Sequence, residues 1–597
     1  GTNNVALGRQ TMQENTTGHS SIAIGYQALY AQTSGNHNIA IGKNALDAVT
    51  VGDRNVAIGT TALTNLNPAS DSDMYNVAIG YSAGLSMSTG INNTIMGGLA
   101  GDAITTGNEN VAIGMSALTS ATTSNNNTAI GYLAAGATTT GAANVAIGNY
   151  ALDANTTASN NVAVGYLALS ATQTSSNSTA VGYGALAANT AANNTAFGKE
   201  ALLANTSGSQ NVAVGAIALD ANTVGGQNTA VGYAALSTVT TASANTAVGH
   251  NALLLTTGGQ NTAMGHSALE NNAAGEFNTG LGDFALFANT SGSGNVAIGK
   301  DALLDSTTAS NLTAIGYQSL ANNTTGTSNV AVGYVALDAN TTGSNNTAIG
   351  NESLSAAVDV DHNTAVGYRA LKAATATQNT AVGSQTLSAS TTAINNVAVG
   401  MNAGLAITTG GYNTAMGASA LAAATTGNSN VALGYQSLYG ITTGTNNVAV
   451  GRESLKTDTL GSKTVAVGYA ALKTQNFTSA TDAYNTAVGH NAGLSVTTGD
   501  SNTLIGALTG DALTVGTDNT AVGVSALGAD TQGSGSVAIG KNALISQNFT
   551  SATTAYNTAV GRSAGAAVTT GVQNTLIGGL AGDALTDSDF NTALGTF

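Results

Sequence analysis

A short phrase, Asn-(Thr/Val)-Ala-(Val/Ile)-Gly, recurs in 35 near-copies along the whole chain. The glycine that closes each copy can be followed from Gly8 to Gly595. Of the 34 intervals between successive glycines, 28 span 17 residues, three span 16 residues and three span 21 residues. A 17-residue repeat with 16-residue and 21-residue variants is typical of architectures in which each repeat stacks on its neighbour. We therefore predict one continuous repeat domain over residues 1–597, without linkers.

The composition limits both the core and the partners of such a domain. Hydrophobic residues make up 43% of the 597 positions, but only 4% are aromatic and 76 residues are glycine, which predicts a thin core of small and aliphatic side chains. Charged residues make up 7%, with a net charge of −16, unlike the basic surface of a nucleic-acid-binding protein. No cysteine is present, which excludes disulfides and thiolate metal sites. Since no apolar run approaches the ~18 to 20 residues of a membrane span, we expect no membrane insertion in this segment.

The phrase itself predicts a short strand. With Asn as the first position of the repeat, the second and fourth positions are mostly β-branched, as strands favour. Alternation places these two on one face, and the third-position Ala and the fifth-position Gly on the other. We expect the β-branched face to line the interior of each repeat. The small Ala and Gly side of the strand then suggests that another surface packs close against it, such as a neighbouring chain across a threefold axis. The alternative is a narrow coil with these small residues inside.

A second apolar block, an Ala-Leu pair such as Ala28-Leu29, follows at the eighth and ninth positions, and Thr-Thr-Gly often comes later. Helical solenoids need longer repeats, and this much Gly, Thr and Asn weakens helices. We therefore predict an all-β fold, a parallel β-solenoid (β-roll or β-helix) of about 35 coils, each with two short strands and two turns. The repeating residues with expected structural roles are Gly25, Gly42 and Gly59, which permit positive φ, and Asn55 and Asn110, which either form a hydrogen-bonded ladder from coil to coil or serve only as turn formers.

Two irregular features are candidates for surface recognition. The 21-residue repeats, near residues 59–80, 468–489 and 540–561, each add four residues at the same turn, and insertions that keep the register belong in outward loops. Their aromatic candidates are Tyr75, Tyr484, Tyr556, Phe477 and Phe549. The alternative is a neutral loop left by duplication.

The sixth position, just after the glycine, holds Tyr in 11 repeats and Lys, Arg or His in many others. Such side chains combine an apolar body with a polar tip, which predicts an outer ridge. Its candidate recognition residues are Tyr26, Tyr81 and Tyr183. Two roles are compatible with this ridge: packing over the coil and binding of sugars.

The sequence offers no support for catalysis. Asp102, Asp511 and Asp583 occupy equivalent places, but no His recurs at a fixed offset from them, and the six His show no metal-ligand spacing. Gly-x-Gly fragments arise by chance in a chain so rich in Gly. We expect no enzyme activity, no cofactor and no metal.

The phrases Asn55-Val56-Ala57-Ile58-Gly59 and Asn110-Val111-Ala112-Ile113-Gly114 resemble the head repeats of trimeric autotransporter adhesins. The longer phrase Asn-Thr-Ala-Val-Gly-Tyr-x-Ala-Leu resembles the repeats of phage tail fibres and of tail-fibre-like bacterial proteins. The resemblance implies a homotrimeric fibre of left-handed parallel β-rolls that reaches and attaches to a surface. Autotransporter heads favour a shorter repeat than the one seen here, and no coiled-coil stalk, neck or barrel anchor is visible.

We therefore expect a structural and adhesive protein outside the cell, on a virion or cell surface: the shaft of a phage or virus tail fibre that binds a host cell-surface glycan or protein. The alternatives are a bacterial surface adhesin and a self-assembling extracellular filament, whose open ends would expose strand edges. An ice-binding solenoid is a further alternative. It would need Thr from alternating positions, whereas the Thr-Thr pair of this repeat is adjacent and points opposite ways in a strand.

Overall fold

The computed structural model describes residues 1–596, and these residues form strands, turns and bends with no helix. The chain divides into two compact units, residues 1–295 and 296–597. Each unit is a stack of coils that follow the repeat of the sequence, and each coil contributes one three-residue main strand, 17 in the first unit and 18 in the second. The predicted all-β parallel solenoid of about 35 coils is thereby confirmed, whereas a single continuous domain stays a prediction.

The main strands of the first unit all carry the second to fourth positions of the repeat. They are β1 (Val5–Leu7), β2 (Ile22–Ile24), β3 (Ile39–Ile41), β5 (Val56–Ile58), β7 (Val77–Ile79), β8 (Thr94–Met96), β9 (Val111–Ile113), β10 (Thr128–Ile130), β11 (Val145–Ile147), β12 (Val162–Val164), β13 (Thr179–Val181), β14 (Thr195–Phe197), β15 (Val212–Val214), β16 (Thr229–Val231), β17 (Thr246–Val248), β18 (Thr262–Met264) and β19 (Thr279–Leu281).

The second unit continues the same pattern. Its main strands are β20 (Val296–Ile298), β21 (Thr313–Ile315), β22 (Val330–Val332), β23 (Thr347–Ile349), β24 (Thr364–Val366), β25 (Thr380–Val382), β26 (Val397–Val399), β27 (Thr414–Met416), β28 (Val431–Leu433), β29 (Val448–Val450), β31 (Val465–Val467), β33 (Thr486–Val488), β34 (Thr503–Ile505), β35 (Thr520–Val522), β37 (Val537–Ile539), β39 (Thr558–Val560), β40 (Thr575–Ile577) and β41 (Thr592–Leu594). The 21-residue coils add pairs of two-residue strands: β4 (Gly52–Asp53) with β6 (Ser72–Asp73), β30 (Gly461–Ser462) with β32 (Thr481–Asp482), and β36 (Gly533–Ser534) with β38 (Thr553–Thr554).

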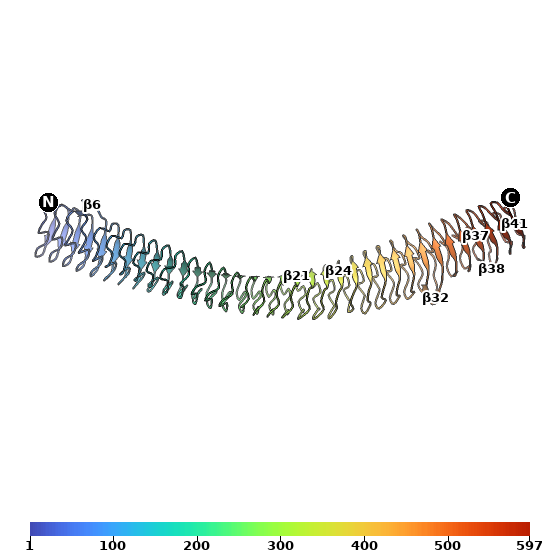
Figure 1. The fold of residues 1–597 in the computed structure, drawn as a ribbon, viewed down its shortest axis with the longest axis horizontal. Coiled ribbons are helices and arrows are strands. Elements are labelled where there is room, and N and C mark those ends of the chain that lie inside the picture. Colours follow the sequence, from blue (N-terminus) through green and yellow to red (C-terminus); the bar gives the residue numbers. More distant parts are fainter. Residues whose placement is uncertain (597) are drawn as a thin grey trace. The chain divides into compact units, whose positions relative to one another are not determined.

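Within each unit, successive main strands pair in parallel and in register, so that each residue lies over its counterpart one coil away (Figure 1). Ala23 pairs with Ala40, and Ala297 with Ala314. Hydrogen bonds between coils also occur outside the strands, for example from the Leu29 amide to the Ala45 carbonyl at 3.0 Å. The backbone is therefore paired with neighbouring coils around much of each circuit, which satisfies groups that would be costly to bury unpaired.

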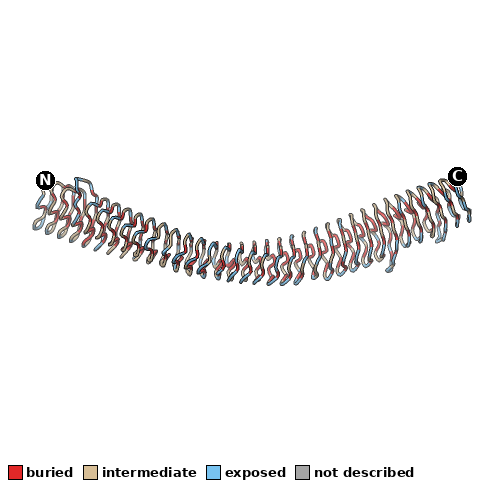
Figure 2. The backbone as a smooth tube through the Cα atoms, viewed as in Figure 1, coloured by how far each residue is buried: buried red, intermediate tan, exposed pale blue. Residues whose placement is uncertain are grey.

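The core of each coil is built from the third-position Ala and the Ala-Leu block, which face each other across a narrow interior. Ala23, Ala28 and Leu29 are fully buried, and their counterparts recur as buried residues from coil to coil (Figure 2). The side chains of the second and fourth positions instead point outward and are partly exposed, as in Ile22 and Ile24.

The expectation that the β-branched face lines the interior is therefore wrong. The Ala side of the strand faces inward, which is the narrow coil that the sequence left open. The physical reason is space: the Leu of the ninth position already fills the interior from the opposite wall, so only a methyl group fits on the strand side.

The Ala-Leu block is not a second strand, which corrects the prediction of two strands per coil. In a regular coil φ is positive at four positions, for example 59° at Ser20, 131° at Gly25, 56° at Gln27 and 50° at Leu29. Left-handed conformations cost a non-Gly residue about 1–2 kcal/mol each. The buried Leu side chains and the bonds between coils offset this cost.

Glycine is required at the fifth position by both conformation and space. Gly25, Gly42 and Gly59 have φ of 131°, 137° and 139°, outside the region that side-chain-bearing residues adopt. A Cβ added at Gly25 would also lie 2.6 Å from the carbonyl oxygen of Gly42 in the next coil. The next coil therefore leaves no room for a side chain at this corner.

The first-position Asn forms a hydrogen-bonded ladder, which is one of the two roles that the sequence left open. The Asn110 Oδ1 accepts a hydrogen bond from the Asn127 amide at 3.1 Å, and its Nδ2 donates to the Ser124 carbonyl at 2.9 Å and to the Asn93 Oδ1 at 3.1 Å. Asn55 takes part in the same ladder, with its amide donating to the Asn38 Oδ1 at 3.0 Å. These side chains are buried, so each bond satisfies a group that water cannot reach.

In three places the core varies through compensating exchanges of volume. One coil after each 21-residue coil, the third-position Ala becomes Ile95, Leu504 or Leu576, and the ninth-position Leu of the neighbouring coils becomes Gly. Leu504 fills the vacated space: a Cβ added at Gly493 would lie 2.8 Å from its Cδ1, and one at Gly510 would lie 2.9 Å from its Cδ2. The second glycine of each exchange belongs to a Leu-x-Gly-Asp-Ala motif, which recurs at residues 99–103, 508–512 and 580–584.

Replacing Asn110 by Ala should destabilise its coil by about 1–3 kcal/mol, because the Asn127 amide and the Ser124 carbonyl lose their buried partners. Hydrogen exchange at the Asn127 amide would measure the effect. Asn110→Ser is the matched control, since Ser178 occupies the same position and still accepts a bond from the Asn194 amide. Equal exchange rates in both variants would contradict the role of the ladder.

Leu504→Ala should destabilise the second unit by about 2–5 kcal/mol through the cavity that it leaves. Adding Gly493→Leu should recover part of this loss, because φ of Gly493, 59°, is close to the 50° of Leu472 at the same position. Gly493→Leu alone should destabilise by crowding Leu472 and Leu504. Thermal unfolding followed by circular dichroism would measure the three variants. If the destabilisation of the double variant equals the sum of the two single effects, Leu504 and Gly493 do not exchange volume.

Candidate interaction surfaces

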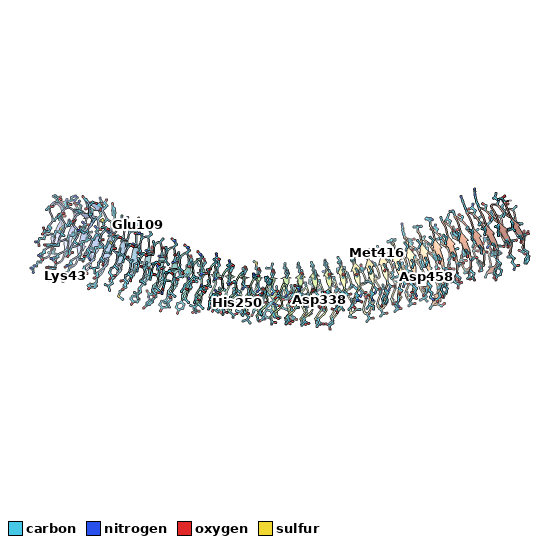
Figure 3. All side chains as sticks on the ribbon, in the orientation of Figure 1. Lys43, Glu109, His250, Asp338, Met416 and Asp458 are labelled. Carbon is cyan, nitrogen blue, oxygen red and sulfur yellow. The ribbon has the colours of Figure 1, made fainter. Side chains whose placement is uncertain are left out.

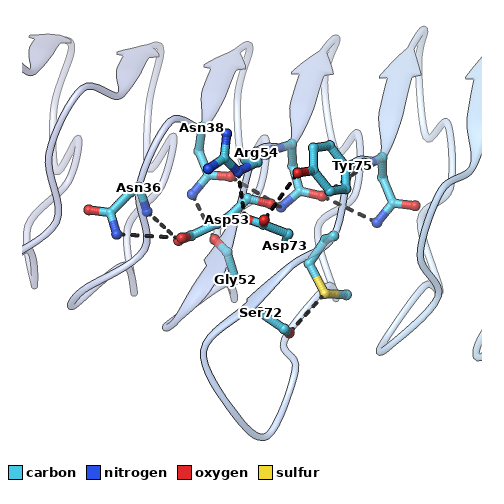
Figure 4. Close-up of polar contacts among 11 residues, drawn as sticks. Asn36, Asn38, Gly52, Asp53, Arg54, Ser72, Asp73 and Tyr75 are labelled. Atoms are coloured by element: carbon cyan, nitrogen blue, oxygen red, sulfur yellow. Dashed lines mark hydrogen bonds and ion pairs between the residues drawn. The ribbon is translucent and has the colours of Figure 1, made fainter.

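The first 21-residue loop, residues 67–75, is fixed by an ion pair at its base (Figure 4). The Arg54 Nε donates to the Asp73 Oδ1, and the Tyr75 hydroxyl donates to the Asp73 Oδ2 at 3.0 Å. The Arg54 guanidinium also lies 5.7 Å from the centre of the Tyr75 ring. The hydrogen bond from Arg54 lowers the pKa of Asp73 below its ordinary value. Arg54 thus links the loop to the preceding coil.

The second loop, residues 476–484, repeats this arrangement with Lys463 in place of Arg54. The Lys463 Nζ lies 2.7 Å from the Asp482 Oδ2, 3.1 Å from the Tyr484 hydroxyl and 5.1 Å from the centre of the Tyr484 ring. In the third loop, residues 548–556, Gly535 and Thr554 replace the cation and the Asp. The ion pair is therefore present in two of the three loops, whereas the Tyr is present in all three.

Tyr75, Tyr484 and Tyr556 are exposed to 52%, 57% and 59%, as a role in recognition requires. Phe477 and Phe549 are only 5% exposed, which corrects their place among the surface candidates. The insertion carries these two rings back against the coil, where the Phe549 ring packs over Gly533 of the preceding coil. Pro68 packs over Gly52 in the same way in the first loop.

The bases of the second and third loops contain a fully buried carboxylate that the sequence interpretation missed. The Asp458 Oδ1 accepts from the amides of Gly461 at 3.0 Å and Phe477 at 3.3 Å, and its Oδ2 accepts from the Gln475 Nε2 at 2.7 Å. Asp530, Gly533, Phe549 and Gln547 reproduce this set. A buried charge of this kind is tolerated because several donors surround it. Its sequence signal is an Asp followed, one coil later, by a Gln that directly precedes Asn-Phe.

The sixth-position side chains form an exposed ridge, and Tyr26, Tyr81 and Tyr183 are exposed to 39%, 63% and 52%. Several rings of this ridge stack on the neighbouring coil. The centroids of Tyr166 and Tyr183 are 5.5 Å apart at 15°, and those of Tyr233 and His250 are 5.2 Å apart at 18°. A sugar stacks on a free ring face, and such ring-on-ring contacts cover one face of each partner. The three candidates lie on separate coils and do not form one site.

The outward face of the main strands is the most uniform surface of each unit. Its second and fourth positions hold Val, Ile, Leu, Thr, Met or Phe in every coil, with no charged residue. Exposed members include Ile147 at 37%, Phe197 at 43%, Val214 at 38% and Met416 at 45%. Met416 is labelled in Figure 3. Sequence reasoning missed this surface because it placed the same side chains inside.

A row of half-buried carboxylates lies at the tenth position, outside the strands. Burial raises the pKa of Asp153, Asp220 and Asp338 above the ordinary value of 3.8. Each has one carboxylate oxygen, buried, without a hydrogen-bond partner. Asp511, noted in the sequence, belongs to this row, and burial raises its pKa as well.

Within residues 1–596, no three His, Asp or Glu side chains are grouped as metal ligands. In the same range no helix is long and apolar enough to cross a membrane. The surface hollows include notches of about 350 Å³ beside Gln260 and Phe277, and about 290 Å³ beside Gly136 and Asp153.

Comparisons of the sequence with protein-family models and with curated proteins found no match. The resemblance to adhesin heads and tail fibres therefore remains an expectation that rests on the repeated phrase alone.

Asp338→Asn should raise the midpoint of thermal unfolding at pH 7 but not at pH 4. Burial raises the pKa of Asp338 in the folded chain above 3.8. Above this raised pKa the folded chain carries a buried charge, which lowers its stability. As the pH falls through the raised pKa towards 3.8, the carboxylate takes up a proton and this loss of stability disappears. The variant should therefore differ from the unmodified chain only at the higher pH. Asp102→Asn is the control, because Asp102 accepts a hydrogen bond from the Thr119 hydroxyl at 2.6 Å at the same position. A midpoint for Asp338→Asn that stays unchanged at pH 7 would contradict this argument.

Proposed function

We propose that this chain is the shaft of a homotrimeric extracellular fibre, most simply that of a phage or virus tail fibre or of a related bacterial surface adhesin, which attaches to a host cell surface. The observation that carries the proposal is the uncharged face of the main strands, which is apolar at every fourth position and holds Val, Ile or Thr at the second. Monomeric proteins rarely expose apolar patches of more than a few hundred Å². A face of this kind is expected to be covered.

The size of the face supports a second and a third copy of the chain as its cover. Main strands about 4.8 Å apart and three residues wide give a face roughly 80 Å long and roughly 10 Å across in each unit. That area, about 800 Å², equals what each partner contributes to a stable interface. Three chains around one axis would each cover this face on the others, and the repeated phrase resembles families with such an arrangement.

Ice binding and end-to-end filament assembly receive less support. Ice binding requires a flat and regular outer array, and the threonines of the second position do share the outward face with the fourth position. Yet Met96, Phe197, Met264 and Met416 interrupt that array with bulky side chains of different length. A filament formed by end-to-end association would leave the strand face uncovered along its whole length.

The double variant Ile147→Lys/Val214→Lys should convert a trimer of this chain into monomers, because it buries charges in the proposed interface. Both side chains point away from the coil interior, so each coil should still fold. Mass measured by light scattering would report the change. Leu203→Lys is the matched control: Leu203 is also 37% exposed but lies at the tenth position, outside the strand face. A monomeric unmodified chain would refute the trimer, and dissociation by both variants would refute the choice of face.

A further inference from the structure

The second and third 21-residue loops are near-copies of each other within one unit. Residues 475–489 and 547–561 differ only where Asp482 is replaced by Thr554. They start four coils apart, so the loops are separated by roughly 20 Å at about 4.8 Å per coil. Their strands β32 and β38 lie on the same edge of the second unit in Figure 1.

Both loops have rigid bases. The buried Asp458 and Asp530 each accept two backbone amides and one Gln side chain, and Phe477 and Phe549 are buried beside them. In the first loop the equivalent base is apolar, with Val49, Leu66 and Met74 buried there instead. Two different bases thus support an excursion of the same length at the same corner. The exposed excursion is the common feature, which favours a role for its tip.

The tips of the second and third loops are neutral and rich in hydroxyl groups. Thr478 and Ser479 are exposed in one loop, and Thr550 and Ser551 in the other. A half-exposed Tyr stands at the end of each loop. Asp482 is the only charged residue in the two loops, and it is paired with Lys463. Such groups exchange hydrogen bonds with neutral polyhydroxylated ligands and offer little to phosphate or sulfate.

We propose that these two loops form a bivalent binding element for a neutral polysaccharide with a repeating unit. The inference rests on the proposed attachment function and names its ligand class. Two identical tips at a fixed separation bind the same motif twice only when the ligand repeats, as a surface polysaccharide does. Binding of one tip then raises the effective concentration of the polymer at the other and strengthens the whole by about 10²–10⁴-fold.

The experiment removes four residues from one or both loops of the full chain, which restores the regular 17-residue coil. The variants lack Thr478–Thr481, Thr550–Thr553, or both segments, and the matched control lacks Ala69–Ser72 of the acidic first loop. Thermal unfolding checks that each variant folds. Binding is measured to immobilised β-glucan, mannan, galactan and chitin, and to a single-repeat oligosaccharide of each polymer.

We expect one deletion to weaken binding to at least one polymer by about 10²-fold or more, because the gain from bivalency is lost. The same deletion should halve the number of oligosaccharide sites without changing their Kd. Both deletions together should abolish binding, and the control should bind as the intact chain does.

A double-deletion variant that binds as strongly as the intact chain would overturn the inference and leave the attachment function standing. A single deletion that weakens polymer binding only twofold would overturn bivalency. Binding to host cells that is lost after protease treatment but kept after periodate would overturn the ligand class in favour of a protein. An intact chain that binds neither polymers nor cells would overturn the attachment function and the inference together.

Discussion

The stacking of each coil on the next, in register, governs the rest of this structure. Main strands pair residue for residue, as Ala23 does with Ala40, and amides outside the strands bond to the neighbouring coil as well. A residue added or removed inside the strand would shift every outward side chain inward. Changes of length are therefore confined to the corner before the strand, where the 16-residue coils lose a residue and the 21-residue coils gain four.

The same constraint determines what the interior accepts. Leu29 and its counterparts reach the core only because the backbone adopts a positive φ at the ninth position, and they leave room for a methyl group alone on the strand side. Where the strand carries Leu504 instead, Gly493 and Gly510 provide the space. The core therefore tolerates exchange between opposite walls but not net growth, as expected for an interior packed at crystal-like density.

Much of the fold is predictable from the sequence, because a 17-residue period and a β-branched phrase allow few architectures. The solenoid and its strand follow from these two features, whereas the role of Asn110, in a ladder or only at a turn, stayed open until the structure showed the ladder. The inward face does not, because alternation shows which residues share a face but not which face is enclosed. That choice depends on Leu29 arriving from the opposite wall. Phe549 shows a similar limit: an insertion predicts an outward loop, but not that this ring is buried over Gly533 of the preceding coil.

The outer surfaces differ in how strongly stacking restricts them, and this difference locates the regions available for function. The strand face is free of charge in every coil, which suits the trimer contact proposed for it. The ridge of Tyr166 and Tyr183 varies from coil to coil and contacts mainly itself. The loops depart from the period altogether, yet two of them share a buried Asp, a Gln and a Phe that hold neutral tips in place. The repeat thus keeps the chemical character of the strand face constant, while the loops differ in their bases and in their charge. If the strand face is covered by further copies of the chain, as we propose, the loops are the part of the surface left for other partners.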